Sequence, residues 1–394
     1  MRILIATAGS RGDVAPYTGL GAALRRAGYD VAVATTDTFA RMVRDAGLGF
    51  RRLPADTRGH AGVRSNREVV RAAGVHRGTG PGLRRRAVSE GTDLLLLSTT
   101  TAPLGWLIGE ATGIRSLGVY LQPTAPTADF PPVVTGARSL GRLGNRTAGR
   151  LALRMADRIY AEAVAGLRER LCLPPLSAAA MRARQERAGW PVLHGFGTAL
   201  VPRPADWRPG LEVVGPWWPH HDAGERLPSE LEDFLDAGPR PVLVGFGSMA
   251  AGDGERLSEL AVRALRRAGL RGILQSGNAC LAAEGDDVLT VGDVPHALLF
   301  PRLAAVVHHG GAGTRRDPAG GRPLGGGPGD RRPEPFWAGR LARIGAAPAP
   351  VPFTTLTADG LAGALGRVVG DEAYARAAEK AARHLAAEDG AARV

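Results

Sequence analysis

The sequence predicts an α/β protein of two similar halves, each with helices packed on a parallel sheet. An apolar run over 2–7, a helical pattern over 17–27 and a second apolar run over 31–35 form a strand–helix–strand unit. The same alternation restarts at residue 241, after the stretch 213–219, which is rich in Pro and Trp. We therefore expect two α/β domains that face each other across a cleft.

The first half should continue as one parallel sheet. Apolar runs over 94–97 and 117–121 extend the sheet, and a helical pattern over 150–168 covers one face. The Pro and Trp residues of 213–219 then interrupt the alternation. The N-terminal domain is therefore expected to span residues 1–215.

The second half repeats this design. Apolar runs predict strands over 241–246, 272–275, 288–291 and 304–307, and a helical pattern covers 257–268. Strands that alternate with helices again indicate a parallel sheet. A second α/β domain should follow the first.

The chain ends in a helical pattern over 371–387 that is rich in Ala and charge. This pattern is too polar for a core element. We expect residues 216–372 to form the C-terminal domain and residues 373–394 a helix that packs back toward the N-terminal domain.

The chain has 394 residues and a formal net charge of +12, carried almost entirely by arginine, since Lys380 is the only lysine. A basic surface favours an anionic substrate such as a nucleotide. The densest arginine run, 84–86, has no interleaved aromatic residues. We expect that run to be a solvated face and expect no binding of nucleic acid.

The two cysteines, Cys172 and Cys280, match no metal-ligand spacing and are expected to be core thiols in a reduced compartment. The apolar run at the start leaves no room for a signal peptide, and no apolar run reaches membrane-spanning length. We expect a cytoplasmic protein with no bound metal and no integral membrane association.

The most informative motif runs from Ala304 to Thr314, where a strand ends in paired histidines, glycines and a hydroxyl. Glycines let backbone N–H groups approach an anion, and a helix N-terminus adds positive potential. His309 and Thr314 can donate from their side chains, so the motif predicts a phosphate cradle. A glycine turn with surface histidines is the alternative, because short motifs match by chance.

The segment 315–334 conflicts with the helix and strand expected after the cradle, because Arg, Gly and Pro fill 15 of its 20 positions. Translated one nucleotide out of register, the segment can read AATLRAGVPLVVVPVTADQ, which is a helix, a turn and an apolar strand. We interpret the segment as a compensated frameshift. The alternative is a genuine Arg/Gly/Pro loop, which is long for a compact domain.

Asp13 follows the first strand, at the edge where open parallel sheets bind their ligands. A carboxylate there can accept the proton of a hydroxyl nucleophile. It can equally cap a helix that begins near Pro16. Position alone leaves both roles open.

Six motifs in this order resemble those of family 1 glycosyltransferases: GSRGDVAP, VGPWW, GFGS, DVPH, HHGGAGT and PFWAGR. The SRGD start and the run LQPTAPT at 121–127 are similar to sterol glucosyltransferases and to bacterial enzymes that glycosylate antibiotic aglycones. The resemblance covers nearly the whole chain. It implies the GT-B fold, two Rossmann-like α/β domains that face each other across a cleft.

The resemblance also implies roles for single residues. Asp13 corresponds to the general base, and Gln122, Thr124 and Phe130 to acceptor-binding residues. The implied donor-binding residues are Ser10, Gly247, Ser248, Val294, Pro295, His309, Gly311, Gly313, Thr314 and Glu334.

Two positions depart from the family pattern. The acidic–Gln pair that holds the sugar falls at Pro333 and Glu334 and is absent, although the shifted frame restores it as DQ. Asn278 stands where many relatives have tryptophan. The first departure puts donor binding in doubt if the printed segment is genuine.

The implied reaction is inverting, independent of metal and free of cofactors. A sugar passes from a UDP- or dTDP-linked donor to a hydroxyl of a hydrophobic natural-product aglycone, such as a polyketide, macrolide or sterol-like acceptor. Two alternatives stay open. One is a nucleotide-sugar epimerase of the same fold, and the other is a catalytically impaired nucleotide-binding homologue if segment 315–334 is genuine.

Overall fold

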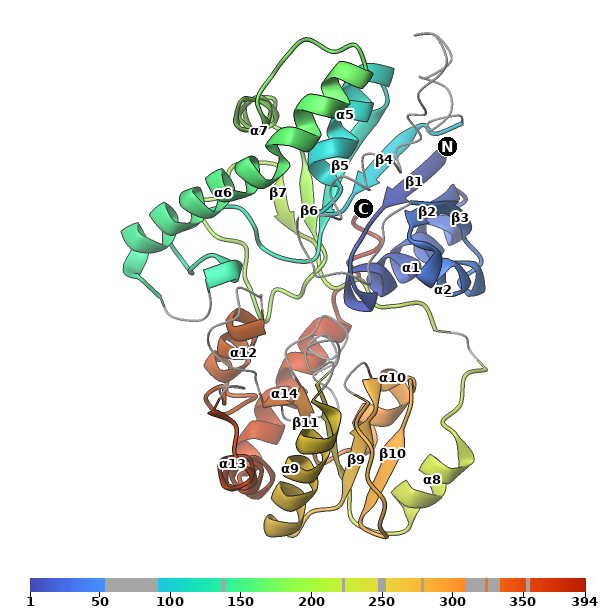
Figure 1. The fold of residues 1–394 in the computed structure, drawn as a ribbon, viewed down its shortest axis with the longest axis vertical. Helices are drawn as coiled ribbons and strands as arrows, with labels where there is room; N and C mark the ends of the chain where they lie inside the picture. The colour runs from blue at the N-terminus through green and yellow to red at the C-terminus, as the bar shows by residue number, and fades with distance from the viewer. Residues whose placement is uncertain are drawn as a thin grey trace.

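The computed structural model of the protein describes two parallel sheets with helices packed against them (Figure 1). The expected α/β class and its two similar halves are confirmed. The described residues are 1–53, 91–135, 139–221, 224–246, 253–277, 280–308, 323–324, 334–351 and 355–394.

The N-terminal half contains a seven-stranded sheet in the order β3-β2-β1-β4-β5-β6-β7, and all of its strand pairs are parallel. Its central strands are apolar runs buried on both faces, as a sheet covered by helices requires. The strands are β1 Arg2–Ala6, β2 Asp30–Thr35, β3 Gly49–Arg52, β4 Leu94–Leu97, β5 Arg115–Tyr120, β6 Val192–His194 and β7 Leu211–Val213.

Two helices of this half begin earlier than predicted. The helix expected over 17–27 starts at Arg11, because Ser10 and Asp13 cap it there and Pro16 is tolerated in its second turn. The helix expected from 150 starts at Gly141, although several glycines lower the helix propensity of its first turns. The helices are α1 Arg11–Arg26, α2 Ala40–Asp45, α5 Ala102–Thr112, α6 Gly141–Arg170 and α7 Ala178–Arg187, with short 3-10 turns η1 Asp37–Phe39 and η2 Val133–Thr135.

The C-terminal half contains a five-stranded parallel sheet in the order β10-β9-β8-β11-β12. The short edge strand β12 lies inside the Arg/Gly/Pro segment and includes Pro323, which an edge position tolerates. The strands are β8 Val242–Gly245, β9 Gly272–Gln275, β10 Val288–Val291, β11 Ala305–His308 and β12 Pro323–Leu324.

The helix predicted over 257–268 is present as α9, and its packing explains why the sequence pattern revealed it. In α9, Leu257, Leu260, Ala261, Ala264 and Leu265 recur at helical spacing, and all are buried against the sheet. Each fully buried leucine contributes about 1.5–3 kcal/mol. The helices are α8 Ser229–Asp236, α9 Gly254–Arg267, α10 His296–Leu299, α12 Glu334–Arg343, α13 Ala358–Gly370 and α14 Glu372–Ala386, with the 3-10 turn η4 Phe300–Arg302.

The end of the chain contacts the N-terminal half. The Thr198 N–H donates to Glu388 Oε1 at 3.0 Å, and Trp217 Nε1 donates to the Gly390 carbonyl at 3.0 Å. Ala391 and Val394 pack against the core of the first sheet, and Figure 1 shows the C-terminus beside it. Residues 388–394, here called the strap, therefore lie against the N-terminal half. The domain limits at 215 and 372 and the helix over 373–394 stay predictions.

The two cysteines are exposed, so the expectation of core thiols is wrong. Cys172 and Cys280 both have a left-handed backbone, with φ of +56° and +53°. Turns of this kind lie at the surface. The apolar residues around a cysteine in the sequence do not show that it occupies such a turn. No helix in the described part of the chain is long and apolar enough to cross a membrane.

Candidate active site

The start of α1 places Asp13 at the carboxyl end of β1. Asp13 Oδ2 accepts hydrogen bonds from Ser10 N at 2.8 Å and from Ser10 Oγ at 2.9 Å. Asp13 is the third residue of the helix and Ser10 is its N-cap, as in a capping box. The capping role is therefore present, although the cap residue is Ser10 and the helix begins before Pro16.

Capping occupies one oxygen of the carboxylate. Within the described residues, Asp13 Oδ1 accepts no hydrogen bond. A carboxylate can hold a helix end with one oxygen and receive a proton on the other. Capping and base catalysis are thus compatible at this residue.

Gly9 makes this arrangement sterically feasible. Its φ is +145°, and a Cβ built on it would lie 2.4 Å from Asp13 Oδ2. Any other residue would push the carboxylate away from the cap. Thr7 Oγ1 also donates to the Asp13 carbonyl at 2.7 Å, which fixes the backbone below the side chain.

An ion pair joins α1 to the second half. Arg11 on the first turn of α1 contacts Asp293, which follows β10, and both side chains are more than half exposed. Partial burial lowers the pKa of Arg11, whereas the charge of Glu225 opposes this shift. The pair shows that the carboxyl ends of β1 and β10 lie close to each other. Its exposure means that it contributes little to stability.

The predicted donor residues Val294 and Pro295 lie beside this ion pair. Val294 is buried in the core of the second half, and Pro295 is the N-cap of α10. These placements give both residues a packing or helix-start role, and their contact with the donor stays a prediction.

His296 follows them and is a residue to which the sequence analysis gave no role. Its ring stacks on Phe300 at 4.6 Å between centroids, and its Nε2 lies 3.2 Å from Gln275 Nε2. Burial lowers the pKa of His296 to about 4, helped by the charges of Arg11 and His221. The ring is therefore neutral at neutral pH and lies near two other basic side chains.

The predicted acceptor segment follows β5. Gln122 and Thr124 are partly buried. Asp206 fixes the segment, because its carboxylate accepts from Thr127 Oγ1 at 2.6 Å and from Ala128 N at 2.9 Å. Burial alone raises the pKa of Asp206, but these hydrogen bonds together with the charge of Arg146 outweigh it, and the net shift is downward. Sequence analysis did not predict this role of Asp206, because a single aspartate in a loop belongs to no recognisable motif.

Phe130 lies in the core between this segment and α12. Its exposed fraction is 4%, and its ring meets Phe336 edge-on at 5.3 Å. The Arg340 guanidinium lies 5.5 Å above the Phe130 ring, and burial lowers the pKa of Arg340 to about 10. Phe130 thus packs the two halves together, and its contact with an acceptor stays a prediction.

Most of the predicted donor site lies outside the described residues. The strands that lead to it are adjacent, because His308 at the end of β11 pairs with Gly245 at the end of β8. Both strands therefore end at the same edge of the sheet. Outside the described residues are Gly247, Ser248, His309, Gly311, Gly313 and Thr314, together with the side chain of Glu334.

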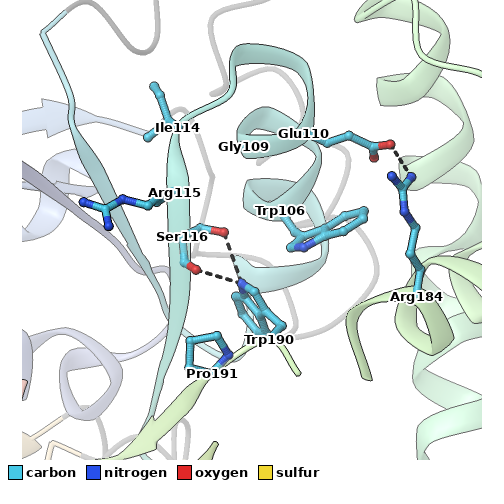
Figure 2. A pocket seen from close by; sticks show the side chains of 9 residues that line it. All are labelled: Trp106, Gly109, Glu110, Ile114, Arg115, Ser116, Arg184, Trp190 and Pro191. Carbon is cyan, nitrogen blue, oxygen red and sulfur yellow. Dashed lines mark hydrogen bonds and ion pairs between the residues drawn. The ribbon is translucent and has the colours of Figure 1, made fainter. Parts of the chain in front are cut away.

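A cavity of about 580 Å³ lies elsewhere, at the amino end of β5 (Figure 2). Trp190 Nε1 donates to the Ser116 carbonyl at 2.9 Å, and Glu110 pairs with Arg184 on α7 at 2.6 Å and with Arg168 on α6 at 2.9 Å. These bonds tie α5, α6 and α7 together. The predicted site lies at the opposite, carboxyl edge of the same sheet.

Comparison with known proteins decides the family. The model of the glycosyltransferase family 28 N-terminal domain matches residues 3–79. An O-mycaminosyltylonolide 6-deoxyallosyltransferase from Streptomyces fradiae is 34% identical over 99% of this chain and 95% of its own length. The chain belongs to the GT-B glycosyltransferases. The resemblance seen in its motifs is confirmed, although the matching model carries the family 28 name.

A further relative of this glycosyltransferase and a solved structure of the same fold agree. A sterol 3-beta-glucosyltransferase from Arabidopsis thaliana is 29% identical over the whole of this chain and 64% of its own length. The crystal structure of a kitacinnamycin glycotransferase superposes with a TM-score of 0.73 at 19% identity, covering 100% of this chain and 96% of the other. The GT-B fold is thereby confirmed.

Proposed function

We propose that this glycosyltransferase transfers a sugar from a UDP- or dTDP-linked donor to a hydroxyl of a hydrophobic natural-product aglycone. Polyketides, macrolides and sterol-like compounds are the acceptor class. The names of its relatives support this class, since one acts on a tylonolide and another on a sterol. The observation that carries the proposal is Asp13, held at the carboxyl end of β1 with Oδ1 left to accept a proton.

In the proposed reaction, Asp13 Oδ1 takes the proton of the acceptor hydroxyl as its oxygen attacks the anomeric carbon. The bond to the diphosphate breaks on the opposite face, so one displacement inverts the anomeric configuration. The capping bonds from Ser10 hold the carboxylate in place and limit its rotation. A positioned base of this kind contributes about 10²- to 10⁴-fold to a rate.

The departing diphosphate needs positive partners. We assign His309, Thr314, Ser248 and the glycine amides around them to this role, as the motif predicts. Fixed donors that meet developing charge are each worth about 3–4 kcal/mol. Since they can take the place of a cation, the reaction is proposed to need neither metal nor cofactor.

Incubation with UDP- and dTDP-sugars and a panel of aglycones tests the proposal. A new glycoside of inverted anomeric configuration, seen by mass spectrometry and by the proton coupling at the anomeric carbon, is expected. Turnover should survive EDTA. Interconverted donor sugar without a glycoside would instead indicate epimerisation, which the relatives do not favour, and nucleotide binding without turnover would indicate an impaired homologue.

A further inference from the structure

Among the described residues, helix α6 is packed on one side only. Its C-terminal part is packed, since Ala163, Val164 and Leu167 join the core formed with α5 and α7. In its N-terminal part, only Asn145 and Gly149 are buried. Figure 1 shows this part projecting along the side of the N-terminal half.

Five arginines follow one another on this helix at intervals of four residues. All of them are exposed, and residues four apart are neighbours on a helix surface. One has an ion pair, from Arg142 to Asp129 at 3.4 Å. Within the described part of the chain, the last three form no ion pair. The row is Arg142, Arg146, Arg150, Arg154 and Arg158.

The acids close to this row leave Arg150 and Arg154, in its middle, without an ion pair among the described residues. The Asp206 carboxylate interacts with the charge of Arg146, and Glu162 lies one turn beyond Arg158. Asp157 is engaged by Arg182, whose Nη2 lies 2.9 Å from the carboxylate. Like charges four residues apart destabilise a helix, so the row is unfavourable for folding alone. An external anion would relieve that repulsion.

An apolar row runs beside the arginines, one position later in each turn except at Thr147, which is polar. Leu143, Leu151, Met155 and Ile159 are exposed by 86, 56, 44 and 48%. Leu140 just before the helix is exposed by 58% and extends the row. Large apolar side chains that gather on an exposed stretch of helix indicate a surface that is covered in use.

We propose that this face of α6 docks the protein on an anionic lipid bilayer, with the helix lying in the plane of the interface. Arginine can bind acidic headgroups while the adjacent aliphatic side chains enter the acyl boundary. The pattern distinguishes lipid from nucleic acid, because a nucleic-acid surface would interleave aromatic or polar side chains with its cations. The composition of the rows therefore favours a bilayer.

The docked face adjoins the predicted acceptor segment. Asn145 on the buried side of α6 donates from Nδ2 to the Ala128 carbonyl at 3.2 Å, and Gly149 packs on Pro126. Docking would hold this segment close to the membrane, where hydrophobic compounds concentrate. That consequence rests on the proposed acceptor class, whereas docking itself does not.

Sedimentation of the full chain with vesicles tests the docking. Vesicles of phosphatidylcholine alone are compared with vesicles of equal parts phosphatidylcholine and phosphatidylglycerol. We expect binding to the anionic vesicles, weakened by salt. Replacing Arg150, Arg154 and Arg158 together by Glu should weaken this binding about a hundredfold or more.

A second triple variant controls for net charge. Arg226, Arg240 and Arg263 lie in the other half, are exposed and have no ion pair in the described part of the chain. Replacing these three by Glu makes the same charge change and should leave most of the binding. Thermal unfolding of both variants verifies that each is folded.

An apolar variant tests the second row. Changing Leu151, Met155 and Ile159 to Ser keeps every arginine and should reduce binding at least tenfold. Equal binding to both kinds of vesicle, or equal loss in both arginine variants, would overturn the proposal. So would a dimer in solution that the Ser variant dissociates, since a second copy would then cover the face.

Discussion

At the scale of single residues, Asp13 shows how one carboxylate can serve structure and chemistry together. Its Oδ2 caps α1 through Ser10, and its Oδ1 is left to accept a proton. The sequence placed Asp13 at the correct strand end. It could not decide between cap and base, because the answer depends on which oxygen each neighbour reaches.

We predict that Asp13→Asn removes most of the transfer activity with little loss of stability. The amide oxygen can still accept from Ser10, but an amide cannot take up the proton of the acceptor. Turnover should fall about 10²- to 10⁴-fold. Calorimetric titration with the nucleoside diphosphate should show unchanged affinity.

Ser10→Ala tests the capping role and keeps the Asp13 carboxylate. It removes the N-cap hydroxyl and should cost about 1 kcal/mol of stability. If Asp13→Asn keeps its turnover, the assignment of Asp13 as the base is wrong.

Gly9 gives a second prediction at this scale. Gly9→Ala should destabilise the fold by about 1–3 kcal/mol, because it forces strain at positive φ and a clash with Asp13. Gly28→Ala is the matched control, since Gly28 has φ +90° but no atom within 4 Å of the added Cβ. Urea unfolding should show the larger loss for Gly9→Ala, and equal losses would contradict the predicted clash.

At the scale of elements, the end of β6 carries a buried histidine. His194 is fully buried beside Trp207, and its Nδ1 lies 3.0 Å from the Glu212 carbonyl. Because a carbonyl only accepts, Nδ1 carries the proton. Burial lowers the pKa of His194 to about 4. This residue therefore stays neutral in the fold.

The shifted pKa predicts how stability depends on pH. Between about pH 6.5 and 4 the unfolded chain binds a proton at His194 that the folded chain does not. Stability should thus be intact above pH 6.5 and decrease as the pH falls, by up to about 1.4 kcal/mol per pH unit. His296 acts in the same direction.

Unfolding measured over this range in His194→Gln should show a shallower slope than in the unchanged protein. His221→Gln, which alters an exposed histidine, serves as the control. An unchanged slope in His194→Gln would show that another group sets the acid sensitivity.

The segment 315–334 is the element that the sequence left most uncertain. A strand is present at Pro323–Leu324, beside β11, where the shifted frame also predicts an apolar strand nearby. The frameshift stays a prediction. Intact mass and peptide sequencing from Thr314 to Trp337 should yield the AATLRAGVPLVVVPVTADQ reading, and peptides of the printed sequence would refute it.

At the scale of the whole molecule, the chain end fastens the two halves. Glu388 receives the Thr198 N–H and hydroxyl, and its side chain is 14% exposed. Phe130, Phe336 and Arg340 form a second contact between the halves. Both contacts join residues that are distant in the sequence.

We predict that Glu388→Ala lowers the stability of the protein by about 1.5–3 kcal/mol, because it leaves the Thr198 N–H without its partner. Glu379→Ala, on the helix α14 that precedes Glu388, is the control. That side chain is exposed and lies 3.9 Å from Arg383, so its loss should cost less than about 1 kcal/mol. A thermal melt that shifts equally for both variants would contradict the role of the strap.

The sequence by itself determined the α/β class, most strands and the restart of the pattern in the second half. Apolar periodicity is local, so runs such as Leu94–Leu97 and the helix around Leu257 can be recognised without their partners. Helix starts were less predictable. Pro16 suggested that the first helix begins near residue 16, but Ser10 caps it and the helix begins at Arg11.

The tertiary structure alone decided how Asp13 is held, that Phe130 lies in a core, and that Trp217 meets Gly390. It also decided that the apolar row on α6 lies exposed rather than packed. Each of these outcomes depends on contacts between distant segments. Packing chooses such contacts from many that the local sequence allows, and for that reason no local pattern could have specified them.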